Sequence, residues 1–248
     1  MAQISSRRSY RARWYRGLVA AQTRFVRRRA PLPGVFFEYP PLLSPADELA
    51  NGLTHGVAAV VSLAGAVGLI AAAAQRGSAL MTLACASFAV SLTGVFTMSA
   101  LSHVVGLPRL RQFFRTLDQA AIYLLTAGSA SPFFVRYLLP QGWGWMLPAM
   151  WGIALYATWV KLRGHRVNSV SVGFNVAMGW FPVVAAKPML TSMPAGCTAL
   201  VVASGALYML GVVFLCHDER RRYFHAVWHL LVVAASACTY AAILLYVI

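Results

Sequence analysis

The sequence predicts an all-α protein that crosses a membrane several times. Of its 248 residues, 59% are hydrophobic and only 11% are charged, whereas a soluble domain carries roughly a quarter charged residues. Apolar runs of about 20 residues recur from Leu53 to the C-terminus, which is the length that a helix needs to span a hydrocarbon core about 30 Å thick. Together these observations define a polytopic helical membrane protein.

Seven such runs follow one another along the chain. The expected crossings are 50–74, 79–104, 117–138, 142–161, 170–190, 197–216 and 223–247. The fourth and fifth contain Pro148 and Pro182, which membrane helices tolerate where neighbouring groups satisfy the freed carbonyls. Because the connections are short, we expect one compact seven-helix membrane domain over residues 45–248.

The distribution of basic residues predicts the orientation of these crossings. With the N-terminus in the cytoplasm, 18 of the 21 lysines and arginines fall on the cytoplasmic side, and only Arg76, Arg136 and Lys187 fall outside. Short loops rich in lysine and arginine stay in the cytoplasm. The sequence therefore predicts a cytoplasmic N-terminus and an external C-terminus, and removing one crossing would put later basic loops on the wrong side.

Residues 1–44 form an arginine-rich segment ahead of the first crossing. Nine of the basic residues lie in the first 29 positions, and no acidic residue occurs in the first 37. We expect a retained cytoplasmic tail, disordered or amphipathic, that is attracted to anionic lipid head groups; an organellar transit peptide is the alternative. The plasma (inner) membrane is the expected location, with an organellar membrane as the alternative.

The net charge of +15 could also suggest a nucleic-acid partner. No DNA- or RNA-binding motif accompanies the arginines, however, and most basic residues outside the tail lie in short loops between apolar runs. Lipid, and not nucleic acid, is therefore the expected partner of the basic residues.

Polar residues gather at one end of the predicted helices. Ionisable groups inside a membrane are costly and so suggest a function by default. The predicted topology brings eight polar residues, six of them ionisable, to the cytoplasmic ends of four crossings: Glu48, Asn51 and His55 in the first, Ser99 and His103 in the second, Asp118 in the first turn of the third, and His225 and His229 in the seventh.

The spacing of the histidines indicates a metal site. His225 and His229 are four residues apart and project from one helix face, and His103 from a facing helix could supply a third nitrogen. Three protein ligands with one open position are typical of catalytic zinc, and imidazoles suit Zn²⁺ well, although another divalent ion is not excluded. Ser99 lies one turn from His103, and Asp118 could orient or deprotonate an attacking water.

Each of these residues also has an ordinary structural interpretation. Histidine pairs at this spacing occur without metal, and membrane serines such as Ser99 often bond back to a helix carbonyl. Asp118 could cap a helix or pair with Arg115. Three residues that share one face of the first crossing could form a network around the ligands or a polar contact between helices: Glu48, Asn51 and His55.

Six stretches, taken in order, resemble the hemolysin III branch of the progestin and adiponectin receptor family. They are DELANGLTHG at 47–56, SALSH at 99–103, LDQAAIYLLTAGSASPF at 117–133, MGWFP at 178–182, the pattern of Gly205, Tyr208 and Gly211, and HAVWHL at 225–230. The resemblance implies a seven-helix membrane fold with a zinc ion near the cytoplasmic leaflet. By motif match, His103, His225 and His229 would be its ligands, Asp118 would hold the water, and Ser99 would lie beside it.

The resemblance extends to the alkaline ceramidases, in which the same constellation hydrolyses lipid amides. We therefore expect a zinc-dependent hydrolase of lipid amides or esters, with a membrane lipid as its substrate or ligand. Two other functions stay open: a receptor or signalling protein in which zinc is structural and a ligand shifts helix packing, and a hemolysin III-type membrane-lytic protein. The chain has no amphipathic pore-forming repeat that would favour direct lysis.

Overall fold

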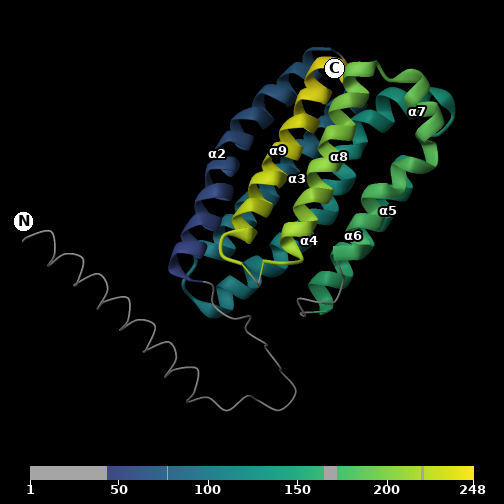
Figure 1. Cartoon of the computed structure of the whole chain (residues 1–248). Helices are drawn as coiled ribbons and strands as arrows, with labels where there is room; N and C mark the ends of the chain where they lie inside the picture. Colours follow the sequence, from purple (N-terminus) through teal and green to yellow (C-terminus); the bar gives the residue numbers. More distant parts are fainter. Residues whose placement is uncertain (1–43, 77, 165–171, 219–220) are drawn as a thin grey trace, which may run out of the picture. The chain divides into compact units, whose positions relative to one another are not determined.

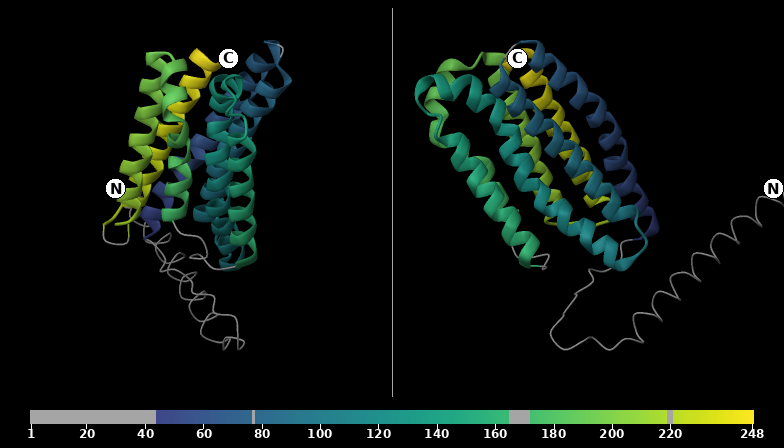
Figure 2. Two further views of the ribbon diagram at one scale, coloured as in Figure 1. Left: turned by 90° about the vertical axis from the view of Figure 1, so that its right-hand side faces the viewer. Right: turned by 180° about the vertical axis from the view of Figure 1, so that it is seen from behind.

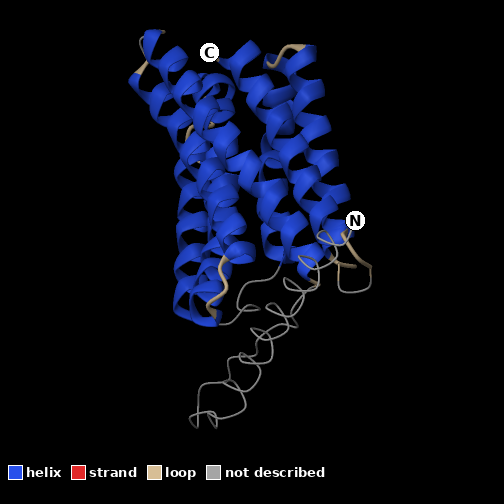
Figure 3. Ribbon diagram, turned by 90° about the vertical axis from the view of Figure 1, so that its left-hand side faces the viewer, coloured by secondary structure: helices blue, strands red, loops and turns tan. Residues whose placement is uncertain are grey.

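The structure, a computed structural model, describes residues 44–76, 78–164, 172–218 and 221–248. Every regular element in these ranges is a helix (Figure 3), which confirms the all-α class. The arginine-rich tail predicted over 1–44 lies, apart from Ser44, outside the described residues.

Eight α-helices are present in this part of the chain. They are α2 (Pro45–Gln75), α3 (Ala79–Val104), α4 (Pro108–Phe133), α5 (Met146–Gly164), α6 (Val172–Trp180), α7 (Ala186–Ser192), α8 (Ala195–Leu215) and α9 (Phe224–Ala242). Short helical segments extend or join them: Phe134–Leu138 and Leu139–Gln141 continue α4, Phe181–Ala185 joins α6 to α7, and Ile243–Val247 continues α9. The helices run up and down between two ends of one bundle (Figures 1 and 2).

Among the described residues, five helical segments are long and apolar enough to cross a membrane. They are Pro45–Gln75, Ala79–Val104, Pro108–Gln141, Ala195–Leu215 and Phe224–Val247. Their outer faces leave large apolar side chains such as Val57 and Val202 exposed, as lipid contact requires. The chain is thus an integral multi-pass membrane protein. Helix α5 and the α6–α7 path run alongside these five (Figure 1), and the count of seven crossings and their orientation stay predictions.

The two prolines have different effects on their segments. Pro148 lies in the first turn of α5, where its missing N–H removes no helical hydrogen bond. Pro182 lies within the 3₁₀ segment Phe181–Ala185, so the predicted crossing at 170–190 is an interrupted helix. The interruption follows from proline chemistry, because the ring removes a backbone donor and clashes with the preceding turn.

The third crossing begins earlier than the predicted residue 117. Helix α4 starts at Pro108, whose fixed φ suits the first helical position. Its first turns carry Arg111 and Arg115, which were predicted to lie in a cytoplasmic loop because they are charged. Both arginines fit on the helix because they form ion pairs with Glu48 of α2. Asp118 therefore lies in the third turn of α4, and the prediction that it occupies the first turn, where it could cap the helix, was wrong.

Two helix pairs bring the polar ends together. Helix α2 packs along α3, α8 packs along α9, and α2 also contacts α9. The start of α2, the end of α3 and the start of α9 consequently lie at the same end of the bundle, the lower end in Figure 1. This arrangement positions the candidate site.

Candidate metal centre

Three histidines from two helices converge at this end. His103 near the end of α3 and His225 and His229 at the start of α9 each offer one nitrogen, and these atoms all lie within 4.8 Å of one another. Their ring centroids are 4.6–5.3 Å apart. His103 and His229 are buried, and His225 is half-buried. The spatial convergence that the sequence predicts is therefore present, in a form that could hold a metal ion.

Two of the rings are held by carboxylates. The Nδ1 atom of His103 lies 2.7 Å from a carboxylate oxygen of Glu48 on α2. The Nδ1 atom of His225 lies 2.7 Å from a carboxylate oxygen of Asp218, just beyond the end of α8. These short distances are those of charge-assisted hydrogen bonds, so each ring has a fixed orientation.

The third ring is held by α2. The Nδ1 atom of His229 lies 3.3 Å from the backbone carbonyl oxygen of Asn51 and 3.1 Å from the hydroxyl oxygen of Thr54. The Thr54 hydroxyl itself donates to the same carbonyl at 2.9 Å. Because a carbonyl can only accept, this bond places the hydrogen of His229 on Nδ1.

All three rings thus use Nδ1 for support, and no hydrogen bond among the described residues involves their Nε2 atoms. A histidine that donates Nδ1–H to an oxygen keeps the lone pair of Nε2, the usual arrangement of a metal-binding imidazole. The donor set therefore fits a divalent metal ion that prefers nitrogen.

Glu48 is the centre of a wider ion-pair network. Besides His103, its carboxylate contacts Arg111 at 3.2 Å and Arg115 at 3.7 Å. These arginines come from the first turns of α4, so the network joins α2, α3 and α4. The predicted place of Glu48 in a network around the ligands is consistent with this geometry.

Asn51 and His55 both lie against the candidate ligand His229. Asn51 supports a ligand through its backbone carbonyl, and its buried side-chain amide has no hydrogen-bond partner in the described ranges. His55 makes no hydrogen bond there either; its ring stacks on that of His229, with centroids 3.6 Å apart. Both are fully buried beside the ligands.

Asp118 is not part of the group of converging ligand atoms, and Ser99 lies one helical turn before His103 on α3. The Ser99 hydroxyl is buried and does not bond back to its own helix. It interacts with the carboxyl group of Asp118, which also lies near Arg115. The two residues are therefore near one another, and their catalytic roles stay predictions.

Two supporting residues, Asp218 and Thr54, were not predicted from the sequence. Asp218 lies in a segment dominated by arginines, and Thr54 looks like an ordinary polar residue of an apolar helix. The available signal for Asp218 was a carboxylate only seven residues before His225 in the sequence. Thr54 had no comparable signal, because its contact with His229 spans 175 positions.

Unpartnered polar atoms surround the histidine cluster. Such atoms cost about 1–3 kcal/mol each when buried. In the described part of the chain they belong to Asn51, His55, Ser99 and Gln119, with Thr93 farther along α3. Four of these five residues belong to the turns that carry or flank the site, which supports a bound polar group there.

Known proteins resemble this chain over nearly all of the described helices. The family described as Haemolysin-III related matches residues 43–240. Hemolysin-3 of Bacillus cereus is 33% identical over 204 residues, which cover 82% of this chain and 92% of that protein. The Hemolysin-3 homolog of Bacillus subtilis (strain 168) is 30% identical over 201 residues, covering 81% and 94%. The human Monocyte to macrophage differentiation factor is 28% identical over 230 residues, covering 90% and 92%.

Proposed function

Because the chain belongs to the haemolysin III-related family, whose match includes all three convergent histidines, we propose that it is a zinc-dependent hydrolase of membrane-lipid amides or esters. The observation that carries the proposal is the set of three Nδ1-supported imidazoles at the ends of α3 and α9. Three imidazoles with an open fourth position are the ligand set of catalytic zinc centres.

Zinc, when bound, would supply a Lewis acid that polarises the scissile carbonyl and activates water. The chain's own residues tune the site for this ion. The carboxylates of Glu48 and Asp218 fix the ligand rings and raise the basicity of their free nitrogens. The carbonyl of Asn51 does the same more weakly for His229.

We assign the proton transfer to Asp118. As water attacks the carbonyl carbon of the lipid, the Asp118 carboxylate accepts a proton from it. The carbon–nitrogen or carbon–oxygen bond then breaks, and Asp118 returns the proton to the leaving amine or alcohol. Arg115 lies near this carboxyl, and the Ser99 hydroxyl beside it can orient it.

The location of the site suits a lipid substrate. The histidines lie at the ends of apolar helices whose outer faces expose large apolar side chains, including Leu49 and Leu53 on α2. A lipid held in the bilayer presents its amide or ester groups near the same depth, just below the head groups. The substrate could therefore approach sideways through the membrane.

The test is metal content together with lipid turnover, measured on the purified full chain. We expect about one zinc ion per chain and hydrolysis of at least one lipid in a panel of ceramides and phospholipid esters. His225→Ala should lose both metal and turnover. Asp118→Asn should keep the metal and lower turnover roughly 10²–10⁴-fold, the contribution typical of a general acid–base. His217→Ala, at an exposed neighbouring position, is the matched control and should change neither.

Two outcomes would overturn this proposal. A wild-type chain that binds no zinc would remove its basis. Stoichiometric zinc without turnover of any lipid, and with lower stability after metal removal, would instead favour a receptor or signalling protein in which the ion is structural.

A further inference from the structure

The contact between Asp218 and His225 connects the end of α8 with the start of α9. The carboxylate oxygen lies 2.7 Å from Nδ1, and each side chain is about one-quarter exposed, at 24% for Asp218 and 23% for His225. A fully exposed ion pair contributes little to stability. This pair is partly shielded, short and attached to a ring of the metal centre, so its orienting effect on that ring is the more important consequence.

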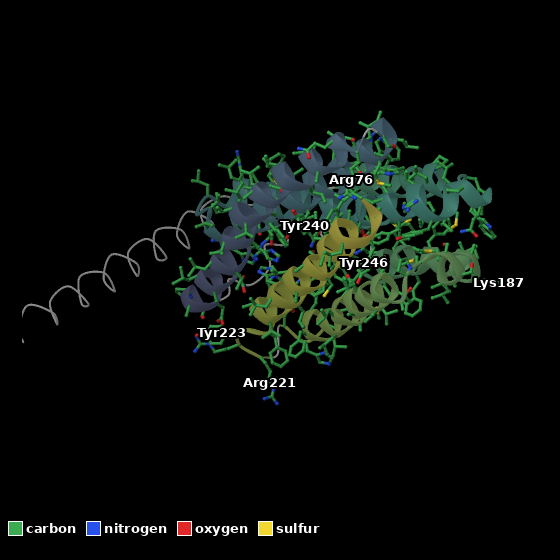
Figure 4. All side chains as sticks on the ribbon, turned by 90° about the horizontal axis from the view of Figure 1, so that it is seen from above. Arg76, Lys187, Arg221, Tyr223, Tyr240 and Tyr246 are labelled. Atoms are coloured by element: carbon green, nitrogen blue, oxygen red, sulfur yellow. The ribbon has the colours of Figure 1, made fainter. Side chains whose placement is uncertain are left out.

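The start of α9, which carries His225, is anchored to another helix. Tyr223, which precedes α9, has a φ of +63°, an uncommon conformation for a bulky residue. Its backbone N–H donates to the carboxylate of Asp47 at 3.2 Å, and Arg222 pairs with the same carboxylate at 3.6 Å. Tyr223 and Arg221 lie together at the beginning of α9 (Figure 4). The start of α9 is therefore fixed to α2, which keeps His225 within reach of Asp218.

Glu48 and Asp218 differ in the number of charged groups that their carboxylates contact. Glu48 shares its charge among His103, Arg111 and Arg115. Within the described ranges the only ion-pair partner of Asp218 is His225. Among the described residues, the carboxylate of Asp218 thus contacts a single imidazole, whereas that of Glu48 also contacts two arginines.

The two helix pairs have the same arrangement of carboxylate and histidine. In the α2–α3 pair, one helix gives the histidine and the other gives its carboxylate. The α8–α9 pair repeats this scheme, because Asp218 follows α8 and His225 begins α9. Each helix pair therefore carries its own carboxylate–histidine unit, and the two units face each other across the centre, with His103 and His225 ring centroids 5.2 Å apart.

We propose that Asp218 is a positioning residue of this metal centre. It accepts the Nδ1–H of His225, which selects the tautomer with a free Nε2 and directs that nitrogen toward His103 and His229. The inference rests on the proposed function only for the statement that these histidines bind metal; it does not require that the protein hydrolyse a lipid.

The test compares metal binding by full-length wild type, Asp218→Ala, Asp218→Asn and His217→Ala. Zinc affinity is measured by competition with a chromophoric chelator, and the ligand field is read from the visible spectrum of the Co²⁺-loaded protein. Asp218→Ala should weaken zinc binding roughly 10–100-fold, as loss of a partner that orients a ligand does, and should alter the cobalt spectrum. Asp218→Asn retains an acceptor oxygen and should recover most of both. His217→Ala should match wild type.

The stability of the metal-free proteins is measured as well, to separate an effect on the metal site from an effect on folding. Asp218→Ala and wild type should melt at nearly the same temperature without metal, because the pair is only partly buried. Equal zinc affinities and cobalt spectra for Asp218→Ala and wild type would overturn the proposal, as would an affinity loss matched by an equal loss of metal-free stability. If Asp218→Ala behaves as expected but wild type hydrolyses no lipid, the positioning role stands and only the hydrolase proposal fails.

Discussion

The imidazole of His55 stacks on that of His229, with ring centroids 3.6 Å apart and 14° between the planes. His55 is 3% exposed, and neither of its nitrogens has a hydrogen-bond partner among the described residues. Its contact with the candidate ligand is therefore made by the ring face. Thr54 and Asn51 fix the edge of His229, while His55 covers one of its faces.

This stack predicts different effects for two substitutions at position 55. His55→Ala should weaken zinc binding roughly 2–10-fold, because a ring pair contributes about 0.5–1.5 kcal/mol. His55→Phe keeps the ring and removes two unpartnered buried nitrogens, so it should bind zinc like wild type and melt at an equal or higher temperature. Chelator competition and thermal melting in detergent give the two values. A phenylalanine variant as weak as the alanine variant would show that a nitrogen of His55 is required.

Metal removal should loosen the contact between the two helix pairs. The ligands come from α3 and α9, so a bound ion links the α2–α3 pair to the α8–α9 pair. At a free zinc concentration 100-fold above the dissociation constant, binding stabilises the fold by about 2.7 kcal/mol. A chelator should lower the melting temperature of wild type, and added zinc should restore it. His103→Ala leaves ligands on α9 alone and should show no such response; a full response in this variant would contradict the link.

Gly211 should not tolerate a side chain. A Cβ atom there would lie 2.6 and 2.8 Å from two ring carbons of Trp228, the residue that precedes His229. Gly211→Ala should therefore destabilise the protein by about 1–3 kcal/mol, the usual cost of overpacking. Gly205, on the same helix, provides the control, because a Cβ atom added there would have no heavy atom within 4 Å. Thermal melting should separate the two alanine variants, and equal melting temperatures would mean that Trp228 moves aside without cost.

The predicted orientation can be tested by cysteine labelling. Cys216 is exposed at the end of α8, on the predicted cytoplasmic side, and Gln75 is exposed at the end of α2, on the predicted outer side. With the other cysteines replaced, a membrane-impermeant maleimide should label Gln75→Cys in intact cells and Cys216 only after lysis. The reverse pattern would invert the topology, and labelling of both in intact cells would contradict the predicted number of crossings between them.

Much of this architecture follows from residue patterns along the chain. Helix α3 spans the predicted 79–104, and α9 begins one residue after the predicted 223. The location of His103, His225 and His229 at one end of the bundle could be predicted as well. Successive long helices run in opposite directions, so the position of a residue along its helix determines its depth in the membrane. The depth of a residue in the membrane and the helix face on which it lies both depend on its position along the chain. Apolar periodicity and residue spacing therefore predict them from the sequence.

Contacts that depend on how helices rotate and approach one another could not be obtained in this way. The early start of α4 depends on Glu48 accepting Arg111 and Arg115 from a neighbouring helix. The stacking of His55 on His229 and the hydrogen bond that His225 donates to Asp218 depend on side-chain directions set by packing. The sequence thus determined which residues share a layer, whereas the tertiary structure decided which atoms meet, since hydrogen bonds and ring contacts are effective only within a few tenths of an ångström of their preferred geometry.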